Sequence, residues 1–517
     1  MPDCRSDQAA GGDVTQNANI AGLLRDTATR YPNRIGVVDG SRRLTWAQID
    51  REVDALAAGL LQRGLRAGDR AALLSGNSVE FVISYFAFLR AGLIAVPMNP
   101  AYTAPEVAVL LADSGARVIV FAPAVRTVAQ EACAANPGCE PIEIGGGEWE
   151  GILAAGRDVV LAEVATPADA VALLLFTSGT SGRPKGAMLT HGALRANLDM
   201  LLTLDDPPAA TGDDTVLAVL PLFHVYGLNT VLGVAVRVGA SMVLLDRFDP
   251  AESLRVITEE NVTTVAGAPG MYQVWQAMPQ ARDALAKVRL FSSGGAPLPP
   301  AVLEGFRATT GKDIFEGYGM TETAPVVATT LVGGVPKPGS VGRPLPGVEI
   351  RIVDEDGDDV EENDPGELWV RGPNVFRGYW PDGQGGPDAD GWFRSGDVAY
   401  IDDAGDVHLV DRRREMILVN GFNVYPREIE LAIEGMPEVA EVAVVGIPDD
   451  ATGEAVSALV VAKPGTLLHA DDIAAFCATR LARFKCPTLI RVVAELPHSA
   501  TGKIAKGRLR EVYGDGG

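Results

Sequence analysis

The chain has 517 residues, 47% of them hydrophobic, and it carries 44 Lys plus Arg against 67 Asp plus Glu, a formal net charge of −23. This charge excludes a polybasic nucleic-acid or lipid-surface binder, and the apolar content excludes a wholly disordered chain and is ample for more than one domain. No apolar run approaches the ~20 residues that span a bilayer, and the start lacks a secretory signal, so we expect a cytoplasmic protein without a transmembrane segment.

The first two-thirds of the chain alternate helical patterns with short β-branched runs. Helices are predicted for residues 46–63 and 79–91. Buried strands are predicted, in chain order, for residues 70–74, 94–97, 118–121, 170–176, 215–220 and 241–245. Such alternation predicts a mostly parallel sheet covered by helices, and therefore an α/β architecture.

Beyond about residue 341 the pattern changes to short strands separated by Gly, Pro and Asp turns, at 348–354, 366–371, 398–402 and 406–411. These predict a small β-rich subdomain. After residue 411 the order is a helix at 426–434, strands at 439–446 and 455–462, and a helix at 470–481, which predicts an α+β module. The predicted domains are therefore 15–411 and 412–517.

The negative charge lies almost wholly on the first of these domains. Residues 412–517 hold 13 basic and 14 acidic side chains, which leaves a net −22 on residues 1–411. Within the tail module, the stretch 480–510 has eight basic residues and one acid, Glu495. A solvated basic face and a surface that meets a polyphosphate are both open interpretations of this strip.

The five cysteines are Cys4, Cys133, Cys139, Cys477 and Cys486. They are odd in number, widely spaced and contain no Cys-x-x-Cys pair, which argues against a disulfide framework and a thiolate metal site. We expect free thiols that mostly serve packing.

The strongest local motif is TSGTSGRPKG, residues 177–186, directly after an apolar strand. Its glycines free backbone N–H groups for close approach, and its hydroxyls and Lys185 add donors and a cation, which is what a triphosphate needs. The alternative is an ordinary Gly/Ser turn. The spacing differs from the P-loop of kinases and GTPases.

Four further motifs follow in chain order. GYGMTET at 317–323 offers an aromatic ring for a base, a hydroxyl for a phosphate and a carboxylate for Mg²⁺, although Tyr and Glu in a loop are usually structural. WFRSGDVA at 392–399 offers a carboxylate for a ribose diol. DRRREMI at 411–417 contains three consecutive arginines, and TGKIAK at 501–506 places Lys503 near the C-terminus, where a lysine is usually a solvated surface residue.

In this order the motifs resemble the adenylate-forming superfamily, which contains acyl-CoA synthetases, nonribosomal-peptide adenylation domains and beetle luciferases. The resemblance runs from Leu44 to Lys503. It implies a large N-terminal domain of α/β subdomains with a β-rich part and a mobile C-terminal domain, jointed near Arg414. That hinge position is often Asp or Lys in the family, so its electrostatics differ here.

Carried over residue by residue, the resemblance assigns a catalytic set, an ATP- and CoA-binding set and a Mg²⁺-binding set. The catalytic set is Lys503, Thr321, Glu322 and His224. The ATP- and CoA-binding set is Thr177, Ser178, Gly179, Thr180, Ser181, Gly182, Lys185, Gly295, Ala296, Gly317, Tyr318, Gly319, Asp397, Arg412 and Gly421. The Mg²⁺-binding set is Glu322 and Thr180.

The implied roles follow the family. The loop and Lys185 hold the β- and γ-phosphates, Tyr318 stacks on adenine, and Asp397 with Arg412 holds the ribose. Lys503, delivered by the small domain, bridges the substrate carboxylate and the α-phosphate. A second catalytic Lys that some members carry has no counterpart in residues 416–420.

Shorter motifs indicate which molecule accepts the acyl group and which acid is activated. GFNVYPREIE at 421–430 resembles acyl-CoA ligases, and FHVY at 223–226 lacks the Asp by which amino-acid adenylation domains pair the amino group, so CoA is favoured over a carrier protein. His224 is alternatively a satisfied core imidazole.

Pocket segments are expected at 224–234, 266–272, 292–297 and 323–327. They contain no Lys or Arg to pair a second carboxylate, which disfavours malonate-like acids. Small residues favour a medium- or long-chain fatty acid over an aryl acid.

The expected partners are therefore a small carboxylic acid, ATP, Mg²⁺ and CoA, with no nucleic acid; a homodimer is left open. The competing hypotheses are a carrier-loading adenylating enzyme, a luciferase-like oxygenase and a non-enzymatic nucleotide-binding protein. The last is disfavoured because Lys185, Glu322, Asp397 and Lys503 are all present.

Overall fold

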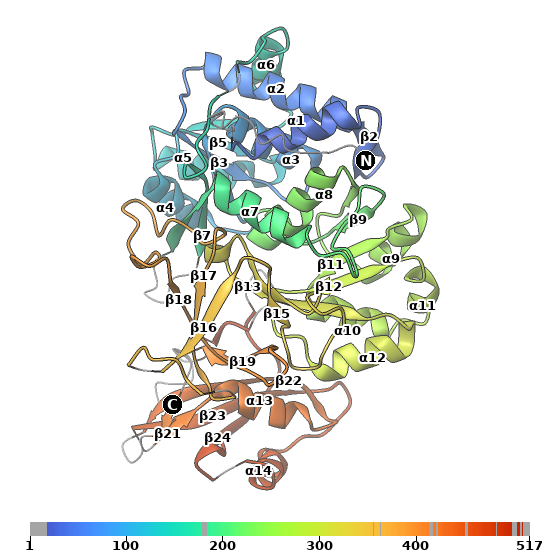
Figure 1. The fold of residues 1–517 in the computed structure, drawn as a ribbon, viewed down its shortest axis with the longest axis vertical. Helices are drawn as coiled ribbons and strands as arrows, with labels where there is room; N and C mark the ends of the chain where they lie inside the picture. Colours follow the sequence, from blue (N-terminus) through green and yellow to red (C-terminus); the bar gives the residue numbers. More distant parts are fainter. Residues whose placement is uncertain are drawn as a thin grey trace, which may run out of the picture.

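The structure is a computed structural model and describes residues 18–162, 164–177, 184–354, 356–361, 363–412, 417–419, 422–449, 453–481, 483–498, 504–506 and 509. It is a mixed α/β molecule with a large N-terminal part and a smaller C-terminal one, as the sequence predicts. Figure 1 shows the helices of the first 160 residues at one end of the long axis and the C-terminal module, in orange and red, at the other.

The largest sheet has nine strands in the order β15-β14-β13-β12-β11-β9-β10-β1-β2. In chain order they are β1 (Ile35–Asp39), β2 (Arg42–Thr45), β9 (Thr215–Ala218), β10 (Ser241–Leu244), β11 (Thr264–Gly267), β12 (Leu290–Ser293), β13 (Ile314–Gly319), β14 (Val326–Thr329) and β15 (Arg343–Pro344). Neighbouring strands from β1 to β13 are parallel, and β2, β14 and β15 pair antiparallel at the two edges.

A second sheet has six strands in the order β6-β5-β3-β4-β7-β8. They are β3 (Arg70–Leu74), β4 (Ile94–Met98), β5 (Val118–Phe121), β6 (Glu140–Glu143), β7 (Val171–Thr177) and β8 (Lys185–Thr190). All neighbours are parallel except the β7–β8 pair. The predicted mostly parallel sheet is thus confirmed, but as two sheets.

The helices of the N-terminal part cover and separate these sheets. They are α1 (Ala21–Arg30), α2 (Trp46–Gln62), α3 (Val79–Arg90), α4 (Ala104–Ser114), α5 (Arg126–Ala134), α6 (Gly147–Gly156), α7 (His191–Leu201), α8 (Val234–Val238), α9 (Pro250–Glu259), α10 (Pro269–Gln276), α11 (Ala281–Ala284) and α12 (Pro300–Thr310), with the short 3₁₀ turn η1 (Pro123–Val125). Every residue of α3 except Glu80 is buried. A helix that is apolar on all sides needs cover on all sides, and α3 shares one core cluster with strands of both sheets.

The predicted β-rich subdomain is a four-stranded antiparallel sheet of β16 (Glu349–Val353), β17 (Gly366–Arg371), β18 (Phe393–Ile401) and β19 (Val407–Arg412). The prediction of a strand at 398–402 was too short, because β18 begins at Phe393 and continues through Gly396, whose φ of +74° a glycine adopts without strain. The motif that contains Asp397 therefore lies within a strand.

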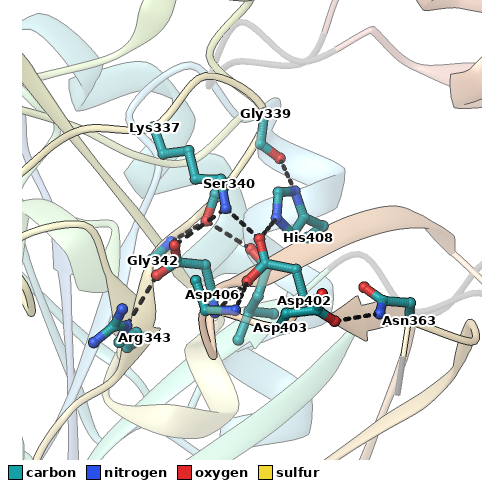
Figure 2. Close-up of polar contacts among 12 residues, drawn as sticks. Lys337, Gly339, Ser340, Gly342, Arg343, Asn363, Asp402, Asp403, Asp406 and His408 are labelled. Atoms are coloured by element: carbon teal, nitrogen blue, oxygen red, sulfur yellow. Dashed lines mark hydrogen bonds and ion pairs between the residues drawn. The ribbon is translucent and has the colours of Figure 1, made fainter. Parts of the chain in front are cut away.

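Polar contacts fasten the β18–β19 hairpin to the loop before β15 (Figure 2). Lys337 and the imidazole of His408 both contact the Asp402 carboxylate, and His408 also reaches the carbonyl of Gly339 at 3.0 Å. Burial would raise the pKa of Asp402, but these partners and two backbone N–H groups hold it well below its usual range. Arg343 donates to Asp406 at 3.0 Å. The small sheet is thereby tied to the edge of the nine-stranded sheet.

The C-terminal module has β20 (Ile417–Val419), β21 (Phe422–Val424), β22 (Val439–Asp449), β23 (Gly453–Ala462) and β24 (Leu489–Val493) in one sheet. Helices α13 (Pro426–Glu434) and α14 (Ala470–Ala478) and the turn η4 (Arg483–Lys485) accompany it. Helix α13 matches its prediction residue for residue, whereas α14 ends three residues earlier than predicted. The module has its own apolar core.

The cysteines and the apolar character of the helices can also be compared with the sequence predictions. Cys133, Cys139 and Cys477 are buried and Cys486 is half-buried, all as free thiols, so the predicted packing role is confirmed for these four. Among the residues that the structure describes, no helix combines the length and the apolarity that crossing a membrane requires.

Asp214 ties together the amino ends of adjacent strands in the nine-stranded sheet. Its buried carboxylate accepts hydrogen bonds from Thr263, before β11, at 2.7 Å and from Arg289, before β12, at 2.8 Å. Burial would raise the pKa of Asp214, but the hydrogen bonds from Arg289, Thr263 and the Thr211 N–H, with the charge of Arg289, outweigh it and lower the pKa to about 2.

We expect Arg289→Leu to lower the free energy of unfolding by about 2 kcal/mol at pH 7, because Asp214 loses its charged partner. The pKa of Asp214 is below its unfolded value near 4, so its contribution is complete above pH 4 and is lost as the pH falls toward 2. Urea denaturation followed by tryptophan fluorescence measures both the change in the free energy of unfolding and its dependence on pH. As a control, the exposed Arg255→Leu should leave the midpoint unchanged. Equal midpoints for Arg289→Leu and the wild type would contradict this role.

Candidate functional site

Described residues of the motifs at 177–186, 317–323 and 392–399 are connected by side-chain contacts across the three N-terminal sheets. Thr177 ends β7 and pairs with Lys185, the first residue of β8, so both ends of the TSGTSGRPKG motif lie in adjacent antiparallel strands of the six-stranded sheet. Ser178, Gly179, Thr180, Ser181 and Gly182 lie outside the described residues. Gly317, Tyr318 and Gly319 lie in β13 of the nine-stranded sheet, not in a loop as predicted, and Asp397 lies in β18 of the small sheet.

Tyr318 and Asp397 are in direct contact although 79 positions separate them. The Tyr318 hydroxyl donates to Asp397 Oδ2 at 2.6 Å. The Asp397 N–H donates to Ser395 Oγ at 3.0 Å, and Asp397 is in register with Arg412 of β19 along the backbone. The structure therefore places together the residues that the motifs assign to adenine and ribose.

Glu322 and Lys185 meet through a residue that the sequence analysis missed. Thr321 and Glu322 form the 3₁₀ turn η3 (Thr321–Thr323) directly after β13. The hydroxyl of Tyr379 donates to Glu322 Oε1 at 2.6 Å, and Lys185 Nζ lies 5.3 Å from the centre of the same ring. The carboxylate that the motifs assign to Mg²⁺ and the ammonium that they assign to the outer phosphates thus share one aromatic partner.

The backbone after Glu322 is held in an unusual conformation. Ala324 has a φ of +62°, which costs a residue with a side chain about 1 kcal/mol or more. Asn229 donates from Nδ2 to the carbonyl of Ala324 at 2.7 Å and to that of Leu194 at 3.0 Å. A Cβ on Gly319 would lie 2.0 Å from the carbonyl oxygen of Pro325, so only glycine fits there. The turn that carries Glu322 is therefore fixed from several sides.

The four segments predicted to line the acid pocket lie against one another. Residues Tyr226–Gly233 form a π-helix, η2, a rare form that often marks functional sites. The Tyr226 and Ser292 hydroxyls are 3.4 Å apart, and the N–H of Gly294 donates to the carbonyl of Gly267 at 3.2 Å. Burial raises the pKa of Tyr226 to about 12, which keeps its hydroxyl neutral.

His224 stands at the entrance to this π-helix and is half-buried rather than enclosed in the core. Its Nδ1 accepts a hydrogen bond from the N–H of Tyr226 at 3.3 Å. In the neutral ring the proton therefore resides on Nε2, which makes this nitrogen the donor. Gly295, with a φ of +83°, and Ala296 follow β12 in the adjoining loop.

Glu316 is a second residue that the motif analysis missed, directly before Gly317. Its side chain is buried and accepts from the N–H of Leu298 at 2.8 Å. Burial raises the pKa of Glu316 to about 8, although that N–H and the charge of Arg427 act against the rise. Arg427 belongs to α13, so a charge of the C-terminal module acts on Glu316. Lys503 and Gly421, the predicted contributions of this module, lie outside the described residues.

The chain matches the family model "AMP-binding enzyme" over residues 24–380 and the model "AMP-binding enzyme C-terminal domain" over residues 428–503. It belongs to the AMP-binding enzyme family. The predicted membership of the adenylate-forming superfamily is thereby confirmed.

Relatives agree with this membership over nearly the whole chain. A feruloyl-CoA synthase of Amycolatopsis sp. is 38% identical, with 94% of this chain and 97% of the relative covered. A long-chain-fatty-acid–CoA ligase of Bacillus subtilis is 34% identical, with coverages of 96% and 94%. Such relatives confirm the predicted enzyme class, an AMP-forming acid–thiol ligase.

A crystal structure of ATP-bound MatB from Rhodopseudomonas palustris superposes with a TM-score of 0.91 at 34% identity, with 97% of this chain and 99% of that chain covered. The likeness spans both the N-terminal part and the C-terminal module. The predicted fold class, a large N-terminal domain with a smaller C-terminal domain, is confirmed.

The residues around Glu322 suit a magnesium ion that the family implies. Mg²⁺ keeps several waters and binds through one or two carboxylates together with substrate phosphates. Among the described residues, no cluster of three or more His, Cys, Asp or Glu side chains forms a metal cage. A lone carboxylate that accepts a hydrogen bond from Tyr379, whose ring also lies beside Lys185, is the donor set that this kind of ion takes.

Proposed function

We propose that this enzyme uses ATP to convert an apolar monocarboxylic acid, a medium- or long-chain fatty acid, into an acyl-adenylate and then transfers the acyl group to CoA. The observation that carries the proposal is the meeting of Lys185, Glu322, Tyr318 and Asp397 where the three sheets join. Residues 15–411 would bind the acid and ATP, and residues 412–517 would deliver Lys503.

In the first step a carboxylate oxygen attacks the α-phosphorus of ATP, and the bond to the β-phosphate breaks with release of pyrophosphate. Two anions must approach each other, so positioning and neutralisation of charge matter more than covalent help. Tyr318 and Asp397, joined by their hydrogen bond, would fix the adenosine, and Lys185 with the loop that begins at Thr177 would neutralise the outer phosphates.

Three other groups would complete this step. Lys503 would bridge the carboxylate and the α-phosphate, Thr321 would contact the α-phosphate, and Glu322, with Thr180, would hold a Mg²⁺ ion. When bound, that ion supplies neutralisation of the phosphate charge. These residue roles are carried over from the family motifs.

In the second step the sulfur of CoA attacks the acyl carbonyl, the thiol proton is lost and AMP leaves. Gly421 would line the path of the pantetheine arm, and the basic strip at 480–510 would meet the phosphates of CoA. Within the strip, Lys485 is paired with Glu428 at 2.7 Å, whereas Arg480 and Arg483 are exposed. Those two arginines are the better candidates for CoA.

An aryl acid is the second candidate for the substrate. The hydroxyls of Tyr226 and Ser292 form a polar pair among pocket segments whose residues are mostly apolar or small, and the phenol of Tyr272 donates to the carbonyl of Ser292 at 2.6 Å. A ring hydroxyl on the acid could bond to such a pair, which an alkyl chain cannot do. The feruloyl-CoA synthase relative supports the same alternative.

Acid-dependent exchange of labelled pyrophosphate into ATP tests the proposal. A panel of C4–C18 fatty acids and of benzoic and cinnamic acids, with and without ring hydroxyls, is compared by kcat/KM. We expect the highest values with fatty acids of eight or more carbons. Values about tenfold higher for hydroxylated aromatic acids would establish the second candidate, and exchange with none of the acids would reject both.

A further inference from the structure

Residues 376–380, which we call the clamp segment, join two parts of the site through the main chain. On one side the N–H of Trp380 donates to the carbonyl of Gly186 at 2.8 Å, and the N–H of Arg377 donates to the carbonyl of Met188 at 3.0 Å. On the other side the N–H of Phe376 donates to the carbonyl of Glu322 at 2.8 Å. The clamp segment thus connects the strand that begins at Lys185 with the turn that carries Glu322.

Tyr379 extends from this segment and contacts both functional side chains. Its hydroxyl donates to Glu322 Oε1 at 2.6 Å, while its ring lies 5.3 Å from Lys185 Nζ. A cation beside an aromatic face is stabilised by the ring, and a carboxylate is oriented by a phenol donor. One side chain can therefore hold an ammonium and a carboxylate at the same time.

The Tyr379 ring is itself held in place. Phe376 packs edge-on against it with ring centres 5.0 Å apart, and Phe376 in turn packs on Phe393. The N–H of Tyr379 donates to the carbonyl of Gln384 at 3.1 Å, and a Cβ on Gly385 would lie 3.1 Å from the ring. The ring position is thus set by packing and does not depend on Glu322 alone.

We propose that Tyr379 is a positioning residue for adenylate formation, which fixes Glu322 for the Mg²⁺ of Mg·ATP and Lys185 for the outer phosphates. The inference rests on the proposed function. Because Oε1 accepts the hydrogen bond of the phenol, the orientation of the carboxylate is restrained, and Glu322 would hold the ion with a fixed side chain. Hydrogen-bond partners of metal-binding carboxylates typically contribute 10–100-fold to metal affinity or activity.

Tyr379→Phe tests the inference because it keeps the ring beside Lys185 and removes only the hydroxyl. Calorimetry measures the Kd of a non-hydrolysable ATP analogue with Mg²⁺ and with EDTA. In the wild type Mg²⁺ should tighten binding. In Tyr379→Phe we expect this tightening to be about tenfold smaller, while the Kd in EDTA changes less than twofold. Pyrophosphate exchange should fall in kcat with the KM for the acid unchanged.

Two further variants separate positioning from a general loss of structure. Tyr400→Phe, a matched change in β18 at a ring stacked on His408, should bind the analogue like the wild type with and without Mg²⁺. In a Glu322→Gln background, Tyr379→Phe should have no further effect on the Mg²⁺-dependent tightening, because the hydroxyl acts through that carboxylate.

An unchanged Mg²⁺-dependent tightening in Tyr379→Phe would overturn the inference, as would full additivity with Glu322→Gln. Failure of the proposed function would look different, because the wild type itself would then show no acid-dependent pyrophosphate exchange. Tyr379→Leu, which also removes the ring, should additionally weaken analogue binding in EDTA by loosening Lys185.

Discussion

Lys503→Ala is expected to slow acyl-adenylate formation by about a thousandfold, the loss typical for removal of a charge that stabilises a transition state. In the proposed first step two anions approach, and Lys503 supplies the cation that bridges them. The second step needs no such bridge, so transfer from a supplied acyl-adenylate to CoA should stay within a few-fold of the wild type. Pyrophosphate exchange and acyl transfer from synthetic adenylate measure the two steps separately.

Lys463→Ala is the matched control for this variant. Lys463 is an exposed lysine of the same module, and its ammonium donates to the carbonyl of Pro437 at 2.7 Å. Both rates should be unchanged in this variant. Equal losses in the two steps for Lys503→Ala would indicate damage to the module instead of a role in adenylation, and an unchanged exchange rate would refute the role.

Glu322→Gln is expected to reduce pyrophosphate exchange by about 10²- to 10³-fold, because the amide keeps the shape of the side chain but removes the charge available to Mg²⁺. The amide oxygen can still accept from Tyr379, so the turn should keep its conformation. The thermal midpoint of the variant should therefore match that of the wild type.

Raising the Mg²⁺ concentration should recover part of the lost exchange if the charge acts through the metal. Glu349→Gln, at an exposed carboxylate paired with Arg371, is the control and should exchange normally. Full exchange activity of Glu322→Gln at low Mg²⁺ would exclude the metal-binding role.

Sequence patterns predicted regular elements well where burial follows a simple period. The strand at 70–74 and the helix at 426–434 coincide with β3 and α13, since each has its apolar residues at the spacing of one buried face or layer. The strand at 398–402 was predicted too short because Gly and Ser at 395–396 are typical of turns. Pairing with β17 and β19 overrides that local preference in β18.

The motifs predict one set of candidate site residues and could not predict another. Lys185, Tyr318, Glu322 and Asp397 stand in short patterns of unusual composition, which a single sequence reveals. Tyr379 lies 57 positions from Glu322 and in a Gly- and Pro-containing stretch that predicts only a loop. Its contact depends on the pairing of the clamp segment with β8, which no local pattern encodes.

The burial of Glu316 is a second feature that could not be predicted from the sequence alone. A glutamate before GYG looks like any other polar residue in a single sequence. In the structure its buried side chain accepts from the N–H of Leu298, and the charge of Arg427 in the C-terminal module acts against the rise in its pKa. The electrostatic effect of Arg427 on Glu316 joins positions more than 100 residues apart. The acid pocket could be predicted only in part, because apolar segments indicate a pocket but not its shape. The contact between Tyr226 and Ser292 depends on the folded chain and has no local sequence pattern.

The most direct test of the proposed function is the release of AMP by the purified enzyme with ATP, Mg²⁺ and a panel of C4–C18 and aromatic monocarboxylic acids, with and without CoA. We predict that sustained AMP release requires both an acid and CoA, and that mass spectrometry finds one acyl-CoA formed for each AMP. The absence of CoA-dependent AMP release with every monocarboxylic acid of the panel would contradict the proposed acyl-CoA ligase activity.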